Sequence, residues 1–411
     1  MTEPLSGRPV TTLLQAVSVT TTGVLPAFLL GALAVQIRDD LDLGPAQMGI
    51  AAAILFAVSG TLARPLGGVV QRMGAGRGMV LSAALATVAL AGAGAAPTFP
   101  VLVAALFIGG LANATAQPSA NLGISRSIGS NRLGLAFGVK QSSIPAASLL
   151  GGLAVPGIAL VLGWRYAFFA GAVLALCLAG WALLRGQAQG TTTAVGEARD
   201  RGTPRGGLVV LTIGAGLAAA AATSLGVFLV DSMVQAGIAP GTAGLIFAGA
   251  AVLGLGIRIL LGTLMDRMPT RSPYVLMANL LVAGVVGYLL LSVGTPALMV
   301  AGTLLAYSAG WTWPGLLHFA VVRDNRLAAA SATGVVQTGL SLGAAGGPLL
   351  FGLLVSATSY STAWVVAGVV ALAAALTFRI ARRMIRKSRG LPVPNLFSIR
   401  NRFTPSVKET S

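Results

Sequence analysis

Charged residues are scarce in this chain. The 411 residues include 27 Lys and Arg and 10 Asp and Glu, together 9% of the sequence, whereas a soluble domain carries about 25%. Hydrophobic residues make up 55% of the chain, and the mean hydropathy is +0.85. So few charged side chains cannot cover the surface of a soluble protein of this length. The composition predicts an integral membrane protein without a large soluble domain.

Residues that commonly carry catalysis are also rare. The chain has one cysteine, Cys177, and one histidine, His318, so a disulfide within the chain is impossible and an H-E-x-x-H zinc motif is absent. No pair of acidic residues lies inside a hydrophobic run, and the G-x-x-x-x-G-K-[ST] loop of ATP-driven pumps does not occur. We therefore expect neither an enzyme nor an ATP-driven pump, and no cofactor or metal.

Long apolar runs dominate what the chain does contain. A transmembrane helix needs about 20 apolar residues, and runs of this length exclude a β-barrel, whose strands alternate with a period of two. We number the runs as spans 1 to 12: residues 13–35, 47–66, 79–96, 99–122, 133–156, 165–184, 208–230, 243–265, 274–293, 297–320, 328–355 and 362–381. The predicted fold class is an all-α integral membrane protein with 12 transmembrane helices.

Basic residues between the spans define an orientation. With the N-terminus inside, the cytoplasmic segments carry 21 Lys and Arg, whereas the outer loops carry two, Arg38 and Arg165. Because Lys and Arg favour the cytoplasmic side, both termini are expected in the cytoplasm. This distribution explains the net charge of +17 without nucleic acid as a partner. The basic residues after span 12 should attract anionic lipids of the inner leaflet, and the Arg-, Ala- and Gly-rich composition indicates, by analogy, a bacterial inner membrane.

The sequence contains an internal repeat. The segment that follows span 2, residues 64–73, matches residues 258–268 after span 8 at an offset near 194, and residues 138–141 in span 5 match residues 334–337 in span 11 at an offset of 196. Several matches in the same order at nearly one offset predict a duplicated six-helix unit. The predicted units are residues 1–184 and 208–384, joined by a polar cytoplasmic linker at 185–207 and followed by a basic, disordered tail at 385–411.

The segment Gly68-Val-Val-Gln71-Arg72-Met-Gly74 resembles the G-x-x-x-D-R-x-G signature of the major facilitator superfamily. With the 6+6 layout and the central linker, the resemblance extends over essentially the whole chain. It implies two bundles related by pseudo-two-fold symmetry, a monomer, and secondary transport by alternating access. It also implies a gating role for Gly68, Gln71 and Arg72, and for Asp266 and Arg267 in the second copy. Because Gln71 replaces the family's acidic residue and cannot form an ion pair, Asp266 is expected to carry that role.

Polar side chains inside the spans are the candidate substrate site, because placing them in lipid is costly. Asn113, Gln117 and Asn121 in span 4 are spaced four residues apart and share one helix face. That face either lines a cavity or bonds to neighbouring helices. Gln15 lies on a weaker polar face of span 1, and Gln337 in span 11 is a further candidate.

Lys140 in span 5 is the clearest single candidate. It lies seven residues after Leu133, roughly 10 Å into the membrane, and the repeat places Val336 at the matching position. Two interpretations remain open: the lysine extends to the cytoplasmic interface, or it offers positive charge to an anionic substrate. Gln141 adjoins it and joins it in the candidate site.

Span 10 presents Tyr307, Trp311 and His318 on one helix face. This face suits either an apolar substrate portion or aromatic packing between helices. His318 and Asp231, at the outer end of span 7, are the candidate coupling residues. For Asp231 an outer gate, a proton entry site and a solvated acidic rim remain open.

The sequence predicts a transporter of a small organic anion, because Lys140 is accompanied by no acidic residue near the centre of any span. Efflux of drugs or metabolites is the alternative, although span 5 lacks a good match to the Gly-Pro motif of antiporters. Proton coupling is compatible with both.

Overall fold

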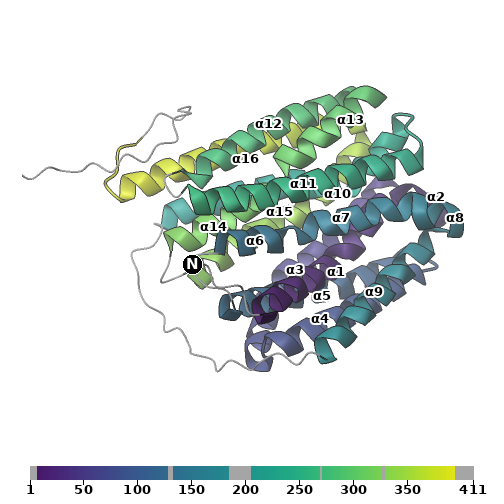
Figure 1. Ribbon diagram of the computed structural model, residues 1–411. Helices are drawn as coiled ribbons and strands as arrows, with labels where there is room; N and C mark the ends of the chain where they lie inside the picture. Colours follow the sequence, from purple (N-terminus) through teal and green to yellow (C-terminus); the bar gives the residue numbers. More distant parts are fainter. Residues whose placement is uncertain (1–6, 128–132, 185–204, 269–270, 326–328, 394–411) are drawn as a thin grey trace, which may run out of the picture.

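A computed structural model describes residues 7–127, 133–184, 205–268, 271–325 and 329–393, and all regular secondary structure within them is helical (Figure 1). The helices of the first six spans are α1 Gly7–Ala32, α2 Ala34–Leu41, α3 Pro45–Met73, α4 Ala75–Gly94, α5 Phe99–Ser127, α6 Leu133–Gln141, α7 Ser143–Ala154, α8 Leu160–Leu162 and α9 Trp164–Leu184. Those of the second six are α10 Arg205–Gln235, α11 Pro240–Arg267, α12 Pro273–Val293, α13 Pro296–Leu305, α14 Pro314–Asp324, α15 Ala329–Ala357 and α16 Tyr360–Ser388. Two π-helical turns, η2 (Val155–Ala159) and η3 (Ala306–Gly310), lie in spans 5 and 10.

Each predicted span falls on a helix or on consecutive helices. Within the described residues, 11 helices are long and apolar enough to cross a membrane. The remaining span, number 10, is divided into α13, η3 and α14, so that no single piece has the required length. Helices are expected here because lipid offers no hydrogen bonds to the backbone, and a helix satisfies its own. The prediction of an all-helical membrane fold is confirmed.

Close helix packing depends on small residues in α15. A methyl group on Gly343 would lie 1.9 Å from the carbonyl oxygen of Gly216 in α10, and one on Gly347 would lie 2.3 Å from that of Ala220. No side chain fits at such separations, so glycine at both positions lets the two backbones touch. Small residues at helix contacts are typical of membrane bundles, where van der Waals packing replaces the hydrophobic effect.

Two of the helix pairs that join the two sets of six spans show how closely these sets pack. Figure 1 shows α4, α5 and α9 in the lower part of the bundle and α12, α13 and α16 in the upper part. Between them, α3 packs against α15, where a methyl group on Gly49 would lie 2.4 Å from the Pro348 carbonyl oxygen. At the other pair, α7 packs against α11, where a methyl group on Gly152 would lie 2.6 Å from the Gly244 carbonyl oxygen. Contacts across these pairs decide whether the halves can separate.

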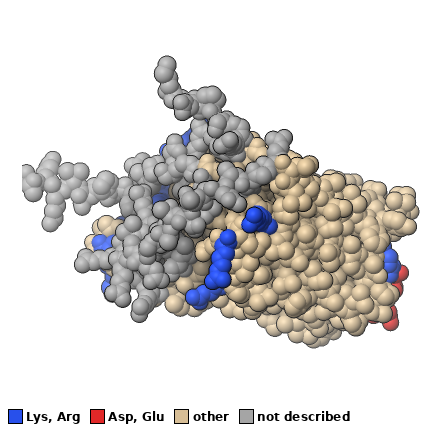
Figure 2. Space-filling view, turned by 90° about the horizontal axis from the view of Figure 1, so that it is seen from below, with Lys and Arg blue, Asp and Glu red and all other residues tan. Residues whose placement is uncertain are grey.

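Acidic side chains are confined to one end of the face shown in Figure 2. They appear at the right-hand end beside a basic side chain, whereas the other basic side chains lie near the middle and toward the left, with a broad uncharged surface between. The right-hand end is the one that carries α2 in Figure 1. We call it the predicted outer end, and the opposite one, with α6 and α14, the predicted cytoplasmic end.

Several boundaries differ from the predicted ones. Helix α10 begins at Arg205, inside the predicted linker, and α16 continues to Ser388, so the start of the predicted disordered tail is helical. Residues 185–204 of the linker and 394–411 of the tail lie outside the described residues. Span 1 continues past its predicted end through α2, because its last turns pack among other helices at the predicted outer end.

Candidate functional site

Lys140 is buried between spans 4 and 5. Its side chain is 2% exposed, and its Nζ donates a hydrogen bond of 2.6 Å to Oε1 of Gln117. Gln117 Nε2 donates in turn to Asn113 Oδ1 at 3.3 Å, and Asn113 Nδ2 donates to Ser59 Oγ at 2.8 Å. The ammonium therefore points inward to an amide chain and does not extend to the interface.

Gln141 and His318 continue this cluster into the second half. Gln141 Nε2 lies 3.2 Å from His318 Nδ1, which is also 2.8 Å from the carbonyl oxygen of Pro314. Gln337 is hydrogen-bonded to the His318 side chain, and Lys140 is near enough to act on it electrostatically. Spans 4, 5, 10 and 11 thus bring together Asn113, Gln117, Lys140, Gln141, His318 and Gln337.

Two other polar candidates lie elsewhere. Asn121 shares a face with Gln117 in sequence, but it is exposed near the end of α5 and does not join the buried cluster. Gln15 is buried in α1 at 2% exposure, and the hydrogen bond described for the Lys140 ammonium goes to Gln117 and not to Gln15. The predicted polar face of span 4 is therefore buried at Asn113, half-buried at Gln117 and exposed at Asn121.

Arg258 is the principal residue of this region that the sequence did not indicate. It is 3% exposed, so its guanidinium does not extend to the membrane interface. Nη1 donates to the backbone oxygen of Gln141, and Nη2 donates to the backbone oxygen of Trp311. Both acceptors lie where a span is broken, so Pro145 and Pro314 were the signals that could have indicated this contact.

Neither Lys140 nor Arg258 has an acidic partner among the described residues. The described ion pairs join Arg38 to Asp231, Arg165 to Asp40, and Arg323 and Arg389 to Asp324. Within the described part of the chain, no carboxylate contacts Lys140 or Arg258. Because a buried charge is costly unless it is compensated, both cations depend on the neutral oxygen acceptors that the neighbouring spans provide.

The aromatic face of span 10 packs between the halves. Tyr307 and Trp311 are 1% and 3% exposed, and the Tyr307 hydroxyl donates to Ser148 Oγ of α7. The Trp311 ring lies 5.7 Å from that of Phe28 in α1, centroid to centroid, and the Tyr307 ring lies 5.8 Å from that of Phe247. These contacts match the interpretation as aromatic packing between helices. Through them, span 10 packs against spans 1, 5 and 8.

Asp231 lies in a polar contact at the predicted outer end. Its Oδ2 accepts a hydrogen bond of 2.5 Å from Arg38 Nη1 of α2 and another from the hydroxyl of Tyr360 in α16. The Asp231 side chain is 4% exposed and that of Arg38 is 20% exposed. Both line a surface recess of about 340 Å³. The contact joins span 1 to spans 7 and 12, so a solvated acidic rim does not describe it.

The signature segment lies at the end of α3 and not in a loop. Gln71 and Arg72 are exposed in the last helical turn, which ends at Gly74 with a φ of 88° that favours glycine. Counting back from Gly74 places the first signature glycine at Gly67, not Gly68. A methyl group on Gly67 would lie 3.7 Å from Pro118 Cβ, whereas one on Gly68 would meet nothing within 4 Å.

In the second copy, Asp266 and Arg267 end α11. Arg267 is exposed, and the Asp266 side chain lies outside the described residues. The offset of 195 that aligns Gly67 with Gly262 and Arg72 with Arg267 places Ala63 opposite Arg258. Arg258 therefore has no counterpart in the first half. The gating role of these residues stays a prediction.

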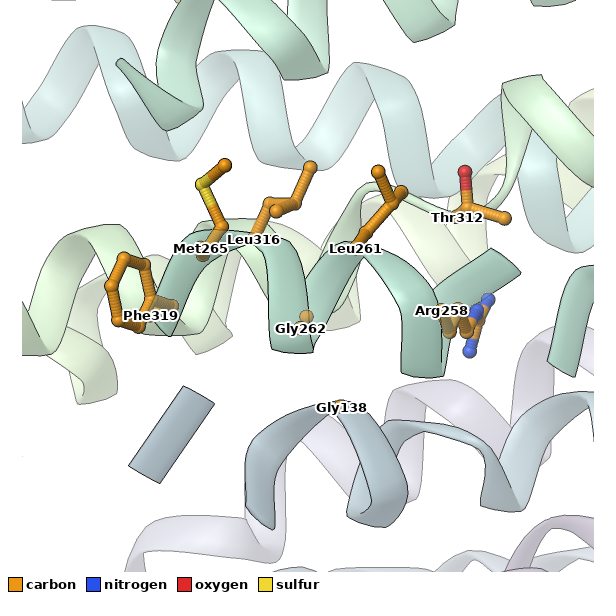
Figure 3. Close-up of a pocket in the computed structure, with 9 residues that line it drawn as sticks. Gly138, Arg258, Leu261, Gly262, Met265, Thr312, Leu316 and Phe319 are labelled. Atoms are coloured by element: carbon orange, nitrogen blue, oxygen red, sulfur yellow. The ribbon is translucent and has the colours of Figure 1, made fainter. Parts of the chain in front are cut away.

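A small cavity lies beside Arg258 where spans 5, 8 and 10 meet. Figure 3 shows Gly138 of α6 facing Arg258 and Gly262 of α11, with Thr312 and Leu316 of span 10 on the far side. The volume of this cavity is about 10 Å³, which is near the minimum that holds one water molecule. A methyl group on Gly138 would lie 3.2 Å from the Arg258 carbonyl oxygen. In this conformation spans 5 and 8 are therefore closed against each other at the predicted cytoplasmic end.

The comparisons with known proteins agree with this architecture. The chain is similar to two crystal structures of a bacterial homologue of the human lysosomal transporter Spinster, both inward-facing. The unoccupied form gives a TM-score of 0.72 at 16% identity and covers 99% of this chain and all of that one. The occupied form gives 0.67 at 16% identity and covers 98% and 100%. No curated protein matches the sequence. The profile of the Major Facilitator Superfamily matches residues 12–331 and again 211–402, and the chain belongs to this superfamily of transporters.

Proposed function

We propose that this transporter carries a small organic anion by alternating access and that Lys140 supplies the positive charge that attracts it. The observation that carries the proposal is the burial of Lys140 without an acidic partner (2% exposed). A cation in such a place costs free energy unless an anion joins it. A substrate anion would compensate the charge of Lys140 only while it is bound. This suits a transporter, whose site must bind its substrate on one side of the membrane and release it on the other.

The neighbours of Lys140 suit an oxygen anion. Lys140 Nζ has three hydrogens, of which one is directed to Gln117 Oε1. The amides of Gln117, Asn113 and Gln141 and the imidazole of His318 add further hydrogen-bond donors. A carboxylate that accepts one of the remaining Nζ hydrogens would form an ion pair as well as a hydrogen bond, which the neutral amide of Gln117 cannot do.

Alternating access requires an end that is closed while the other opens. Across the predicted outer end, Arg38 binds Asp231 at 2.5 Å, and the backbone N–H of Ala46 donates to Ser356 Oγ at 3.1 Å. We infer that this conformation is sealed at the predicted outer end.

The remaining assignments belong to the same proposal. The protein is a monomer in a bacterial inner membrane with both termini in the cytoplasm, and the basic residues at the end of α16 bind anionic lipid. The driving force is an ion or substrate gradient. If protons are the coupling ion, His318 is the group to test, because it is the one histidine in the sequence and its ring lies in the candidate site beside Gln141.

Efflux of lipophilic compounds is the second candidate function. The observation in its favour is the aromatic group formed by Phe28, Phe247, Tyr307 and Trp311 near the centre of the bundle. These rings now pack on one another between the halves. Efflux requires that they separate and admit an apolar compound.

Thermal unfolding of the detergent-purified protein separates the two candidates. The ligands are small carboxylates, phosphate and sulfate in one set and lipophilic cations and drugs in the other. An anion at 100 times its Kd should stabilise the wild type by about 2.7 kcal/mol. The stabilisation should disappear in Lys140→Met and persist in Lys387→Met, which removes an exposed lysine at the end of α16. Stabilisation by lipophilic compounds alone, equal in all three proteins, would replace the anion proposal by efflux.

A further inference from the structure

Two spans are interrupted at the level of the candidate site, and each interruption leaves a backbone oxygen without its helical partner. In span 5, only Ser142 separates the end of α6 at Gln141 from the start of α7 at Ser143. Ser142 keeps helical angles and its own helical hydrogen bonds, so the interruption is a single missing bond. The Gln141 oxygen would accept from the N–H of residue 145 in a continuous helix, but residue 145 is proline, which has none. The Gln141 oxygen therefore needs another donor.

Span 10 is broken in a similar way. The π-turn η3 ends at Gly310, Trp311 leaves the helical conformation with φ −120° and ψ 12°, and α14 begins only at Pro314. The Trp311 oxygen lies in this gap. Irregular backbone at membrane depth is tolerated only when protein or water satisfies it.

Arg258 satisfies both oxygens at once. Its two terminal nitrogens donate to Gln141 and to Trp311, which matches the planar fork of a guanidinium. Gln141 belongs to the first half, whereas Arg258 and Trp311 belong to the second. One buried side chain in span 8 therefore joins the broken parts of spans 5 and 10 across the boundary between the halves.

This bond also fixes the candidate site. Gln141 follows Lys140 directly, and its side chain lies 3.2 Å from His318 Nδ1. The α6 segment that carries both residues is held on α11 by the Arg258 bond and by the close approach of Gly138. When the halves separate at the predicted cytoplasmic end, the bond from Arg258 to Gln141 must break.

We propose that Arg258 is a positioning and gating residue, which holds Lys140 in the site and keeps span 5 closed on spans 8 and 10 until the cytoplasmic end opens. This inference rests on the proposed alternating access but not on the nature of the substrate. Arg258 acts by binding backbone oxygens, so its role depends on its fork and not only on its charge. Arg258→Lys keeps the charge and loses the fork.

A thiol reporter beside Arg258 tests the proposal. Thr312 is 1% exposed and lines the cavity of about 10 Å³, which cannot admit a maleimide. With Cys177→Ser as background, Thr312→Cys should react with a sulfonated maleimide only when spans 5, 8 and 10 separate. Adding Arg258→Lys should raise the labelling rate about tenfold, because one charge-assisted bond is lost. Arg64→Lys, the same change at an exposed arginine of α3, should change it less than about twofold.

Pro145→Ala distinguishes a gate from a simple cap. Alanine restores the N–H that the Gln141 oxygen lacks, so it should reduce the loss of thermal stability caused by Arg258→Lys. It cannot restore the bond between the halves, so the fast labelling should persist. The double variant, Arg258→Lys with Pro145→Ala, also keeps the test possible if Arg258→Lys alone fails to fold.

Two results would overturn the proposal: labelling of Arg258→Lys at the rate of Arg64→Lys, or restoration of slow labelling by Pro145→Ala. The second would show that Arg258 serves only the broken helix. No substrate is present in the assay, so a transporter that binds lipophilic compounds in place of anions would still label as described. Failure of the anion proposal and failure of this one are therefore separate observations.

Discussion

The ion pair between Arg38 and Asp231 should hold the outer end closed, and Asp231→Asn should release it. The pair crosses the boundary between the halves, from α2 to α10, at 2.5 Å. Asparagine has nearly the same shape and can still accept a hydrogen bond from Tyr360. The substitution therefore removes the charge of Asp231 with little change in packing.

The degree of burial sets the magnitude. A fully exposed pair contributes about 0–1 kcal/mol, whereas removing one partner of a buried pair costs about 3–5 kcal/mol. Asp231 is 4% exposed and Arg38 is 20% exposed, so we expect a value between these limits, about 2 kcal/mol. Because 1.4 kcal/mol corresponds to a factor of ten, the outward-open population should rise roughly 25-fold.

A buried thiol below the gate reports this population. Val227 in α10 is 3% exposed, and its Cα would lie 2.8 Å from a methyl group on Gly31 of α1. In the Cys177→Ser background, Val227→Cys should react with a charged maleimide only after spans 1 and 7 separate. If opening and closing are fast compared with the reaction of the thiol, Asp231→Asn should raise the labelling rate roughly 25-fold.

The chain provides a matched control. Arg165 and Asp40 form an ion pair of the same length, 2.5 Å, at the same end, but both residues belong to the first six spans and are 35% and 42% exposed. Asp40→Asn should therefore leave the labelling rate within about twofold of the parent. The exchange of Arg38→Asp with Asp231→Arg should slow the labelling again. Equal rates for Asp231→Asn and Asp40→Asn would refute the assignment of this pair as a gate.

Two further predictions concern packing between helices. Gly343→Ala should reduce the folded yield in size-exclusion chromatography, because the added methyl group would lie 1.9 Å from the Gly216 oxygen; Gly346→Ala, where a methyl group meets nothing within 4 Å, should fold normally. Tyr307→Phe should lower thermal stability by about 1–2 kcal/mol, because it leaves the buried Ser148 hydroxyl without its donor; equal unfolding temperatures for Tyr307→Phe and the wild type would contradict the importance of that bond.

Hydropathy predicted the spans because lipid permits few alternatives to the helix, but it could not predict where a span breaks. Pro26, Pro65, Pro118 and Pro348 all lie inside continuous helices. Breaks near Pro145 and Pro314 occur where a buried arginine from another span satisfies the freed oxygens. The decision between a continuous and a broken helix depends on a tertiary partner, which no local pattern contains.

The candidate site was predictable in part for a similar reason. Two amides at a spacing of four residues indicated a polar face on span 4, and Lys140 is bonded to that face. The sequence could not show whether a lysine or arginine near the end of a span extends to the interface, because both side chains are long enough to do so. Lys140 and Arg258 are both buried, since each finds oxygen acceptors on a neighbouring span.

The features that depart from the internal repeat are the ones that meet at the proposed site. At the offset of 196, Lys140 matches Val336 and Pro145 matches Ser341, and at the offset of 195 Arg258 matches Ala63. At each of these three positions the matching half has a different residue, so the fold of a six-helix unit does not require Lys140, Pro145 or Arg258. Lys140, Arg258 and the proline that leaves the Gln141 oxygen without its helical donor are each present in one half only, and Gln141 adjoins Lys140 and binds Arg258. An asymmetric arrangement of charge inside a symmetric scaffold is what a transporter needs to bind one kind of ligand between two similar halves.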